Sequence, residues 1–215
     1  MRTLAQISLV LVGSVLASAI FLALLVYLFF CPRFNEKMVN FLLLHPIKLK
    51  NVDKKFYCLS GVKGRELTFK FDSSSPKLFG IHYKHPEEKL VGIINYGNSG
   101  NLLEAEQAAR TLLENQVSVF LYDYRGYGKS EGIANLPGIV NDARAAYRYV
   151  TSDLGYSRDK VLFYGASLGS GITSELSKDL PSCGIILDCP FLSLETVSKE
   201  KVGFMNLYPS FLWTD

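Results

Sequence analysis

The chain has 215 residues, of which 48% are hydrophobic, and its formal net charge at pH 7 is only +3. This small charge gives no electrostatic case for binding nucleic acid or a strongly acidic substrate. Its four cysteines form no C-x-x-C pair and no metal-ligand spacing, so we expect no metal ion and no cofactor, and buried free thiols at Cys183 and Cys189.

The first predicted element is a long apolar helix near the amino terminus. From Ile7 to Phe30 the sequence holds 24 residues without a charged residue or histidine, and a helix needs about 20 apolar residues to cross a bilayer core. The alternative, a signal peptide, has a shorter apolar run of about 7–15 residues before a small-residue cleavage site. Pro32 stops the helix. We therefore expect residues 1–32 to form a single-pass anchor in a lipid bilayer, whereas basic residues at both ends leave the orientation open.

The next segments predict a connector and the start of a folded domain. Residues 33–60 are expected to connect the anchor to a domain at 61–215, with part of their apolar surface packed on the membrane or the domain. Apolar residues alternate at 66–71 and 78–83, as in half-buried strands. A serine-rich turn with a proline separates the two stretches, so we expect an antiparallel hairpin at a sheet edge.

Beyond residue 90, apolar runs typical of buried strands alternate with stretches that have apolar residues at helical spacing. The strands are expected at 90–96, 117–122, 161–164 and 184–187, and the helices at 101–114, 136–150 and 168–178. Alternation of this kind predicts βαβ units. The fold class is therefore α/β, with a doubly wound and mostly parallel sheet.

The strand at 161–164 runs into the sequence GASLG, whose central residue is Ser167. A G-x-S-x-G segment between a strand and a helix is typical of a nucleophile elbow, a sharp turn that exposes the hydroxyl and leaves no room for side chains two residues away. The loops 96–101 and 123–132 follow two other strands, and ligands bind where the carboxyl ends of parallel strands meet. There the backbone amides of Leu168 and of loop 96–101 could form an oxyanion hole.

Together these segments resemble the α/β-hydrolase superfamily, and within it the membrane-anchored Bem46-like group. Members typically read HGNxGN in the first loop, DYRGYGxSEG in the second and GxSLG at the elbow, before a strand that ends in Pro-Phe. This chain reads YGNSGN, DYRGYGKSEG, GASLG and DCPF, and the resemblance runs from about residue 65 to the end. It implies that Ser167 is the nucleophile and that the amides of Leu168 and Asn98 are the oxyanion donors. It also implies hydrolysis of an ester, thioester or amide through an acyl-serine, with a small acyl substrate of unknown identity.

Two departures from the family pattern bear on activity. The family's first-loop histidine is Tyr96 here, a change that could narrow the acyl site. Members also carry a triad aspartate and histidine after two later strands, whereas His45, His82 and His85 all precede Ser167. We therefore expect a sheet that is incomplete at its carboxyl-terminal side and a chain without the triad acid and base. Such a chain should be inactive or weak, because removing triad members lowers the rate about 10⁴–10⁶-fold.

Three functions stay open at this point: an incomplete product of a membrane-anchored serine hydrolase, a non-catalytic membrane-anchored binding module, and a hydrolase completed by a partner chain. His82 and His85 are expected to be solvent-exposed residues at a strand end. Asp188 is expected to make local backbone hydrogen bonds at the end of its strand. Asp123 and Arg125 are expected to fix their loop by pairing with backbone groups or with each other.

Overall fold

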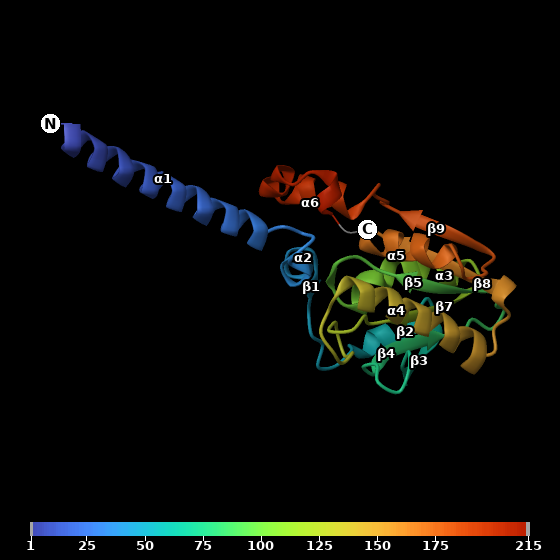
Figure 1. Cartoon of the computed structure of the whole chain (residues 1–215). Coiled ribbons are helices and arrows are strands. Elements are labelled where there is room, and N and C mark those ends of the chain that lie inside the picture. The colour runs from blue at the N-terminus through green and yellow to red at the C-terminus, as the bar shows by residue number, and fades with distance from the viewer. Residues whose placement is uncertain (1, 214–215) are drawn as a thin grey trace.

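The computed structural model describes residues 2–213, and in it a long helix projects from a folded body (Figure 1). Met1, at the start of the expected anchor 1–32, and Thr214 and Asp215, at the end of the expected domain 61–215, lie outside the described residues. The projecting helix is α1 (Arg2–Phe29). Its segment Leu11–Phe29 has a mean hydropathy of 2.5, and none of that segment is buried against other described residues. The prediction of a long apolar helix is confirmed, and within the described chain this helix alone is long and apolar enough to cross a bilayer.

A seven-stranded sheet forms the centre of the body, in the order β2-β3-β4-β7-β5-β8-β9. Neighbours from β2 to β7 pair antiparallel, whereas β7, β5, β8 and β9 run parallel. The strands are β2 (Cys58–Leu59), β3 (Val62–Phe69), β4 (Leu78–Tyr83), β5 (Leu90–Asn95), β7 (Val117–Tyr122), β8 (Val161–Ala166) and β9 (Gly184–Asp188). The mostly parallel α/β sheet is confirmed. The expected hairpin is β3–β4, although the short strand β2 lies outside it at the edge.

Three helices cover the sheet, and the strand order determines which face each of them takes. They are α3 (Glu106–Glu114), α4 (Leu136–Arg148) and α5 (Leu168–Ser177). The chain steps from β5 to β7 through α3, then reverses direction through α4 to β8 and through α5 to β9. Because crossovers between parallel strands are right-handed, this reversal puts α3 on one face and α4 with α5 on the other. With both faces covered, β7 is buried along its whole length.

The connector packs along the carboxyl edge of the parallel strands. It contains α2 (Glu36–Leu43), whose first turn is capped by the side chain of Asn35, and the short strand β1 (His45–Pro46). β1 pairs in parallel with β6 (Ser99–Gly100), which follows β5 directly. The remaining short elements are η1 (Lys54–Tyr57), η2 (Leu102–Ala105), the π-helical turn η3 (Tyr149–Asp153), η4 (Arg158–Lys160), α6 (Leu194–Lys201), η5 (Gly203–Leu207) and η6 (Ser210–Leu212).

The outer edge of β9 has no pairing strand among the described residues, and this predicts self-association. Ile185, Ile186 and Leu187 are 44%, 40% and 36% exposed there, and an open apolar edge is a template for pairing with another chain. We expect Ile186→Lys to lower the oligomeric fraction of the detergent-solubilised chain, measured by size-exclusion chromatography with light scattering. Ile133→Lys is the matched control, because Ile133 is 84% exposed in a loop without strand edges. Equal behaviour of the two variants would count against pairing through β9.

Candidate active site

Ser167 occupies a sharp turn between β8 and α5. Its backbone has φ 51° and ψ −117°, a conformation that a non-glycine residue rarely adopts and that is held by its surroundings. Its N–H donates to the carbonyl of Asp188 at 2.9 Å, and its own carbonyl accepts from the N–H of Ser170 at 2.8 Å. The side chain of Ser167 is exposed at the carboxyl edge of the parallel strands. The turn therefore presents the hydroxyl to solvent rather than to the core.

The two glycines that flank the serine are required by close backbone contacts. A Cβ at Gly165 would overlap the carbonyl of Gly169, and a Cβ at Gly169 would overlap the carbonyl of Asn95. Helix α5 thus approaches β8 and β5 at a distance that only glycine permits. This is the steric reason for the G-x-S-x-G spacing that we inferred from the sequence.

The loop that contains Asn98 lies beside the serine. A Cβ placed on Gly97 would be 3.7 Å from the Cβ of Ser167. The Asn98 side-chain amide donates to the carbonyl of Leu43 at 2.7 Å. Its backbone carbonyl accepts from the Tyr127 hydroxyl and from the N–H of His45, both at 2.8 Å. The loop is therefore fixed from two sides, by the second loop and by the connector.

The first turn of α5 contributes the other expected group at this site. Leu168 is the first residue of the helix, and the first amides of a helix have no partner within it. The helix dipole also favours negative charge at this end. The Leu168 amide and the Asn98 loop therefore lie at the same edge of the sheet as Ser167.

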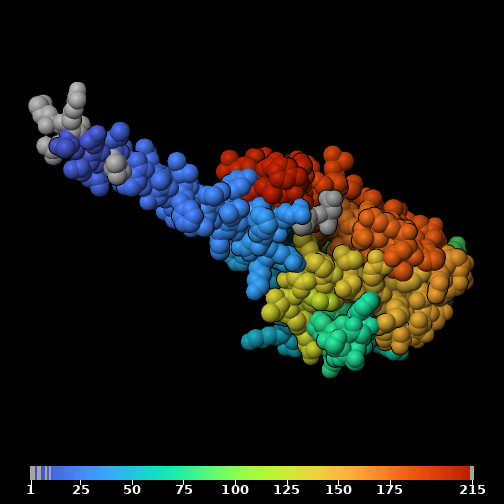
Figure 2. Space-filling view, in the orientation of Figure 1, coloured from blue at the N-terminus to red at the C-terminus, as the bar shows by residue number. Residues whose placement is uncertain are grey.

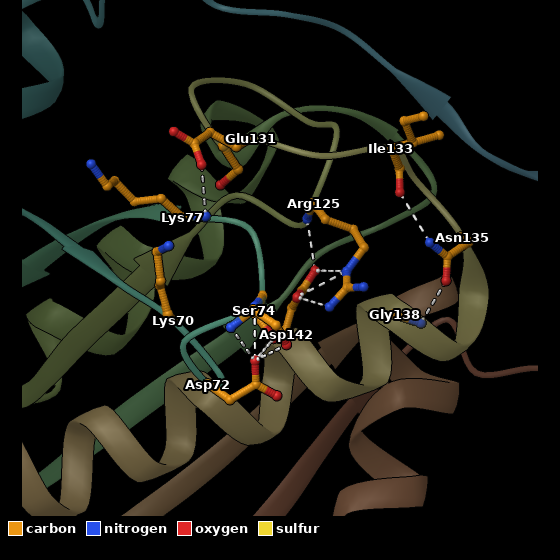
Figure 3. A network of polar contacts seen from close by, with 12 residues as sticks. Lys70, Asp72, Ser74, Lys77, Arg125, Glu131, Ile133, Asn135, Gly138 and Asp142 are labelled. Atoms are coloured by element: carbon orange, nitrogen blue, oxygen red, sulfur yellow. Dashed lines mark hydrogen bonds and ion pairs between the residues drawn. The ribbon is translucent and has the colours of Figure 1, made fainter.

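Asp123, at the end of β7, fixes the second loop from inside. Its buried carboxylate accepts hydrogen bonds from the N–H groups of Leu102 at 2.8 Å and Lys129 at 2.9 Å. Burial raises the pKa of Asp123 from 3.8 to about 6, although the hydrogen bonds from the two amides act in the opposite direction. The expectation that Asp123 bonds to the backbone of its loop is confirmed. Arg125 instead pairs with Asp142 on α4 (Figure 3).

The raised pKa of Asp123 predicts a pH dependence of stability. The folded protein takes up a proton at this carboxyl between about pH 4 and pH 6, so its contribution is most favourable at low pH and is lost as the pH rises through 6. Relative to Asp123→Asn, the wild-type chain should therefore lose up to about 3 kcal/mol of stability between pH 4 and pH 7.5. Urea unfolding in detergent at both pH values measures the difference. A constant difference between the two proteins would contradict the raised pKa.

The histidines do not reach the serine. Within residues 2–213, none of the three makes a hydrogen bond to Ser167. His82 was expected to be exposed, and this is wrong: it is buried in β4, where its Nε2 lies 3.1 Å from the Tyr156 hydroxyl. Burial lowers the pKa of His82 to about 4, so the ring is neutral at pH 7. His85 accepts from the N–H of Glu87 at the opposite edge of the sheet from the elbow.

Two other expectations need correction. The Asp188 carboxylate accepts a hydrogen bond from the Tyr164 hydroxyl at 2.8 Å rather than from the backbone. Cys183 and Cys189 are free but exposed, because neither face of β9 is fully covered by described residues. In the described part of the chain, no three His, Cys, Asp or Glu side chains lie in an arrangement that could hold a metal ion.

Asn95, a buried residue that the sequence patterns did not single out, ties the site to the sheet. Its side-chain amide donates to Oγ1 of Thr173 on α5 at 2.8 Å, and its Oδ1 accepts from the Tyr122 hydroxyl on β7 at 2.5 Å. The side chain thus joins β7, β5 and the elbow helix. A polar residue that ends an otherwise apolar strand, one residue before a glycine-containing loop, was the available signal.

The sheet order, the right-handed crossovers and the strand–serine–helix turn define an α/β-hydrolase fold. A solved esterase of Pyrococcus furiosus is similar in structure with a TM-score of 0.62 at 18% identity, over 78% of this chain and 67% of that chain. An α/β hydrolase of Vibrio vulnificus gives a TM-score of 0.55 at 21% identity, over 62% and 48%. At these identities the similarity concerns the fold alone.

Sequence comparison gives the family. The profile described as serine aminopeptidase, S33, matches residues 89–212, more than half of the chain. The chain therefore belongs to this serine-hydrolase-like family of α/β-hydrolases.

Individual relatives match different shares of the chain. The uncharacterized protein YfhR of Salmonella typhimurium is 26% identical over 170 residues, which cover 70% of this chain and 57% of that protein. The α/β hydrolase domain-containing protein WAV2 of Arabidopsis thaliana is 31% identical over 114 residues, 52% of this chain and 37% of that protein. An uncharacterized membrane protein of Saccharomyces cerevisiae is 40% identical over 83 residues, 38% and 29%. The chain thus spans between 29% and 57% of the length of these relatives.

Proposed function

We propose that this chain is a membrane-anchored serine hydrolase of the Bem46-like group, in which Ser167 attacks the carbonyl carbon of an ester, thioester or amide. The observation that carries this proposal is the exposed Ser167, with its φ of 51°, between β8 and α5. The amides of Leu168 and Asn98 bind the oxyanion that forms when the Ser167 oxygen adds to the carbonyl and its proton passes to a general base. Such donors typically contribute about 2.7–4 kcal/mol each to transition-state stabilisation. Collapse of this adduct breaks the bond to the alcohol, thiol or amine, which leaves as an acyl-serine forms.

The membrane anchor in this proposal is the segment from Ile7 to Phe30. Its support is the exposure of every residue of α1 from 11 to 26, an apolar surface that a bilayer would cover. The yeast relative described as a membrane protein agrees with this placement. Residues 1–32 then form the anchor, 33–60 the connector and 61–215 the hydrolase domain.

The general base is absent from the described surroundings of the serine. His45, His82 and His85 make no hydrogen bond to Ser167 there, and a serine hydroxyl without a base is a poor nucleophile. We propose that the 215-residue chain alone has little or no hydrolase activity. We also propose that a further polypeptide segment, which supplies the general base, pairs with the open edge of β9. Asp188 is at the end of that strand, and its backbone carbonyl accepts a hydrogen bond from the N–H of Ser167, so the strand and the serine are already in contact.

A fluorophosphonate probe, which reacts with activated serines, tests the proposal. In membranes from cells that express the protein, we expect labelling of wild type, no labelling of Ser167→Ala, and unchanged labelling of Ser74→Ala, which replaces an exposed serine in a distant turn. The purified chain should react with the probe at least about 10⁴-fold more slowly, as enzymes without triad members do. Labelling that persists in Ser167→Ala would exclude Ser167 as the nucleophile. No labelling in membranes would favour a non-catalytic binding module.

A further inference from the structure

The carboxyl-terminal part of the described chain packs on the end of α1, far from it in sequence. The rings of Tyr27 and Tyr208 stack with centroids 4.6 Å apart. The Tyr208 hydroxyl donates to the carbonyl of Tyr27 at 2.8 Å, and the Tyr27 hydroxyl donates to the carbonyl of Leu207 at 3.1 Å. Figure 2 shows the red carboxyl-terminal segment against the end of the blue helix. This contact fixes the position of residues 202–213 relative to the anchor.

The contact continues past the end of α1. Phe30 meets Phe204 edge to face at 5.5 Å between centroids. Arg33 donates to the carbonyl of Phe211 at 3.2 Å. Beneath these residues lies a small buried cluster that is separate from the core of the sheet, formed by Cys31, Met205 and Tyr208. Residues 202–213 and α2 therefore surround the point where the anchor meets the body, and we call these two segments the collar.

The length of α1 determines how deep in the bilayer the collar would lie. The segment Leu11–Phe29 has 19 residues, about 28 Å at 1.5 Å per residue, which matches a hydrocarbon core of about 30 Å. Tyr27 then lies at the inner border of the headgroup region. Since Tyr208 stacks on Tyr27, residues 207 and 208 lie at the same depth.

The outer surface of the collar is apolar and aromatic. Phe41 on α2 is 78% exposed, Phe211 is 72% exposed and Leu207 is 67% exposed. Phe204 is also exposed, as is Phe34, which lies just before α2. Aromatic residues are enriched where membrane proteins cross the headgroup region, because their rings are apolar yet tolerate partial hydration. A lipid surface is the occupant that fits an aromatic patch continuous with an apolar anchor.

We infer that the collar lies in the headgroup region of the bilayer and that the carboxyl edge of the sheet opens toward the lipid surface. The site is tied directly to the collar: Leu43, the last residue of α2, accepts the hydrogen bond from the side chain of Asn98, and β1 behind it pairs with β6. Ser167 lies beside this loop. The acyl substrate is therefore a lipid ester taken from the membrane, a statement that rests on the proposed function of Ser167.

The single tryptophan of the chain, Trp213, reports the position of the collar. Its indole N–H donates to the carbonyl of Tyr208 at 3.4 Å. We expect its fluorescence, in the full chain reconstituted into vesicles, to be quenched by lipids brominated near the headgroup. The matched control carries Trp213→Phe and Lys89→Trp, because Lys89 is exposed at the amino end of β5. The control fluorescence should be unchanged by brominated lipid. Equal, negligible quenching of both proteins would overturn the inference.

A second measurement separates the collar from the chemistry. Leu207→Asp with Phe211→Asp should remove most of the Trp213 quenching, with helix content by circular dichroism as the check of folding. In cell membranes the same double variant should lower labelling by a long-chain fluorophosphonate about tenfold, since interfacial affinity follows apolar area, and leave a short soluble probe unaffected. Equal loss with both probes would refute delivery from the bilayer. Quenching without labelling by either probe would support the collar and reject the nucleophile.

Discussion

Replacing Gly169 by alanine is expected to lower the free energy of unfolding by about 3 kcal/mol or more, whereas Gly171→Ala, two residues further along α5, should be tolerated. A Cβ on Gly169 would overlap the carbonyl of Asn95 and lie 2.8 Å from the carbonyl of Tyr96. Both carbonyls belong to the backbone, one at the end of β5 and the other in the loop that follows it, so relief requires moving α5 or β5. Overpacking of this kind costs about 1–3 kcal/mol or more. A loss of this size is a large fraction of the free energy of unfolding, which is typically about 5–15 kcal/mol for a folded domain.

Gly171 makes a matched control because it lies in the same helix and receives the same methyl group. Its added Cβ would lie 3.0 Å from Cζ of Phe191, the tip of a ring that can shift. Alanine also has a helix propensity better than that of glycine by about 1 kcal/mol, so this variant should match or exceed the wild type. Urea unfolding followed by circular dichroism in detergent measures both. If Gly169→Ala unfolded at the wild-type midpoint, the close approach of α5 to β5 would be disproved.

Local sequence patterns were sufficient to predict the strands of the central sheet and the turn at Ser167. The run 117–122 is β7 without a change of bounds, and the runs at 90–96, 161–164 and 184–187 differ from β5, β8 and β9 by one or two residues. β5 and β7 are apolar on both faces because helices cover both, so their burial can be predicted from each short segment alone, whereas the equally apolar β9 is exposed. The glycines around Ser167 are likewise explained by contacts of their own turn and neighbouring strands.

Properties set by distant packing were not predictable in the same way. His82 looked like an exposed strand end, but Tyr156, 74 residues later, covers it and bonds to it. The partner of Arg125 is Asp142 on the following helix, and no spacing rule connects a loop residue to one face of α4. The packing of Tyr208 on Tyr27 joins residues 181 apart. In each case the partner was known only once the topology had brought the segments together.

The pair of Arg125 and Asp142 leads to the second large expected effect. Arg125 Nη2 lies 2.7 Å from Oδ1 of Asp142, whose side chain is 1% exposed, and the backbone N–H of Arg125 donates to Oδ2 at 2.7 Å. The guanidinium lies over Gly138 at the start of α4, where a side chain would displace it (Figure 3). The pair therefore joins the second loop to the helix that follows it.

Arg125→Leu is expected to destabilise the chain by about 3–5 kcal/mol, because it leaves a buried carboxylate without its cation. Arg144→Leu is the control, since Arg144 also lies 2.7 Å from an aspartate, Asp179, whose side chain is 54% exposed. Losing that solvent-exposed pair should cost about 0–1 kcal/mol. Equal effects in urea unfolding would show that burial does not set the strength of the first pair.

The pH dependence of the Arg125→Leu effect gives an independent check. Burial already raises the pKa of Asp142, while Arg125 lowers it. Removing the arginine lets the pKa in the folded state rise further above the unfolded value, so the variant gains a proton on folding at mildly acidic pH. The deficit of Arg125→Leu relative to wild type should therefore shrink as the pH falls from 7.5 toward 5. A loss of packing around the arginine stem alone would give the same deficit at both pH values, because no charge would then be involved.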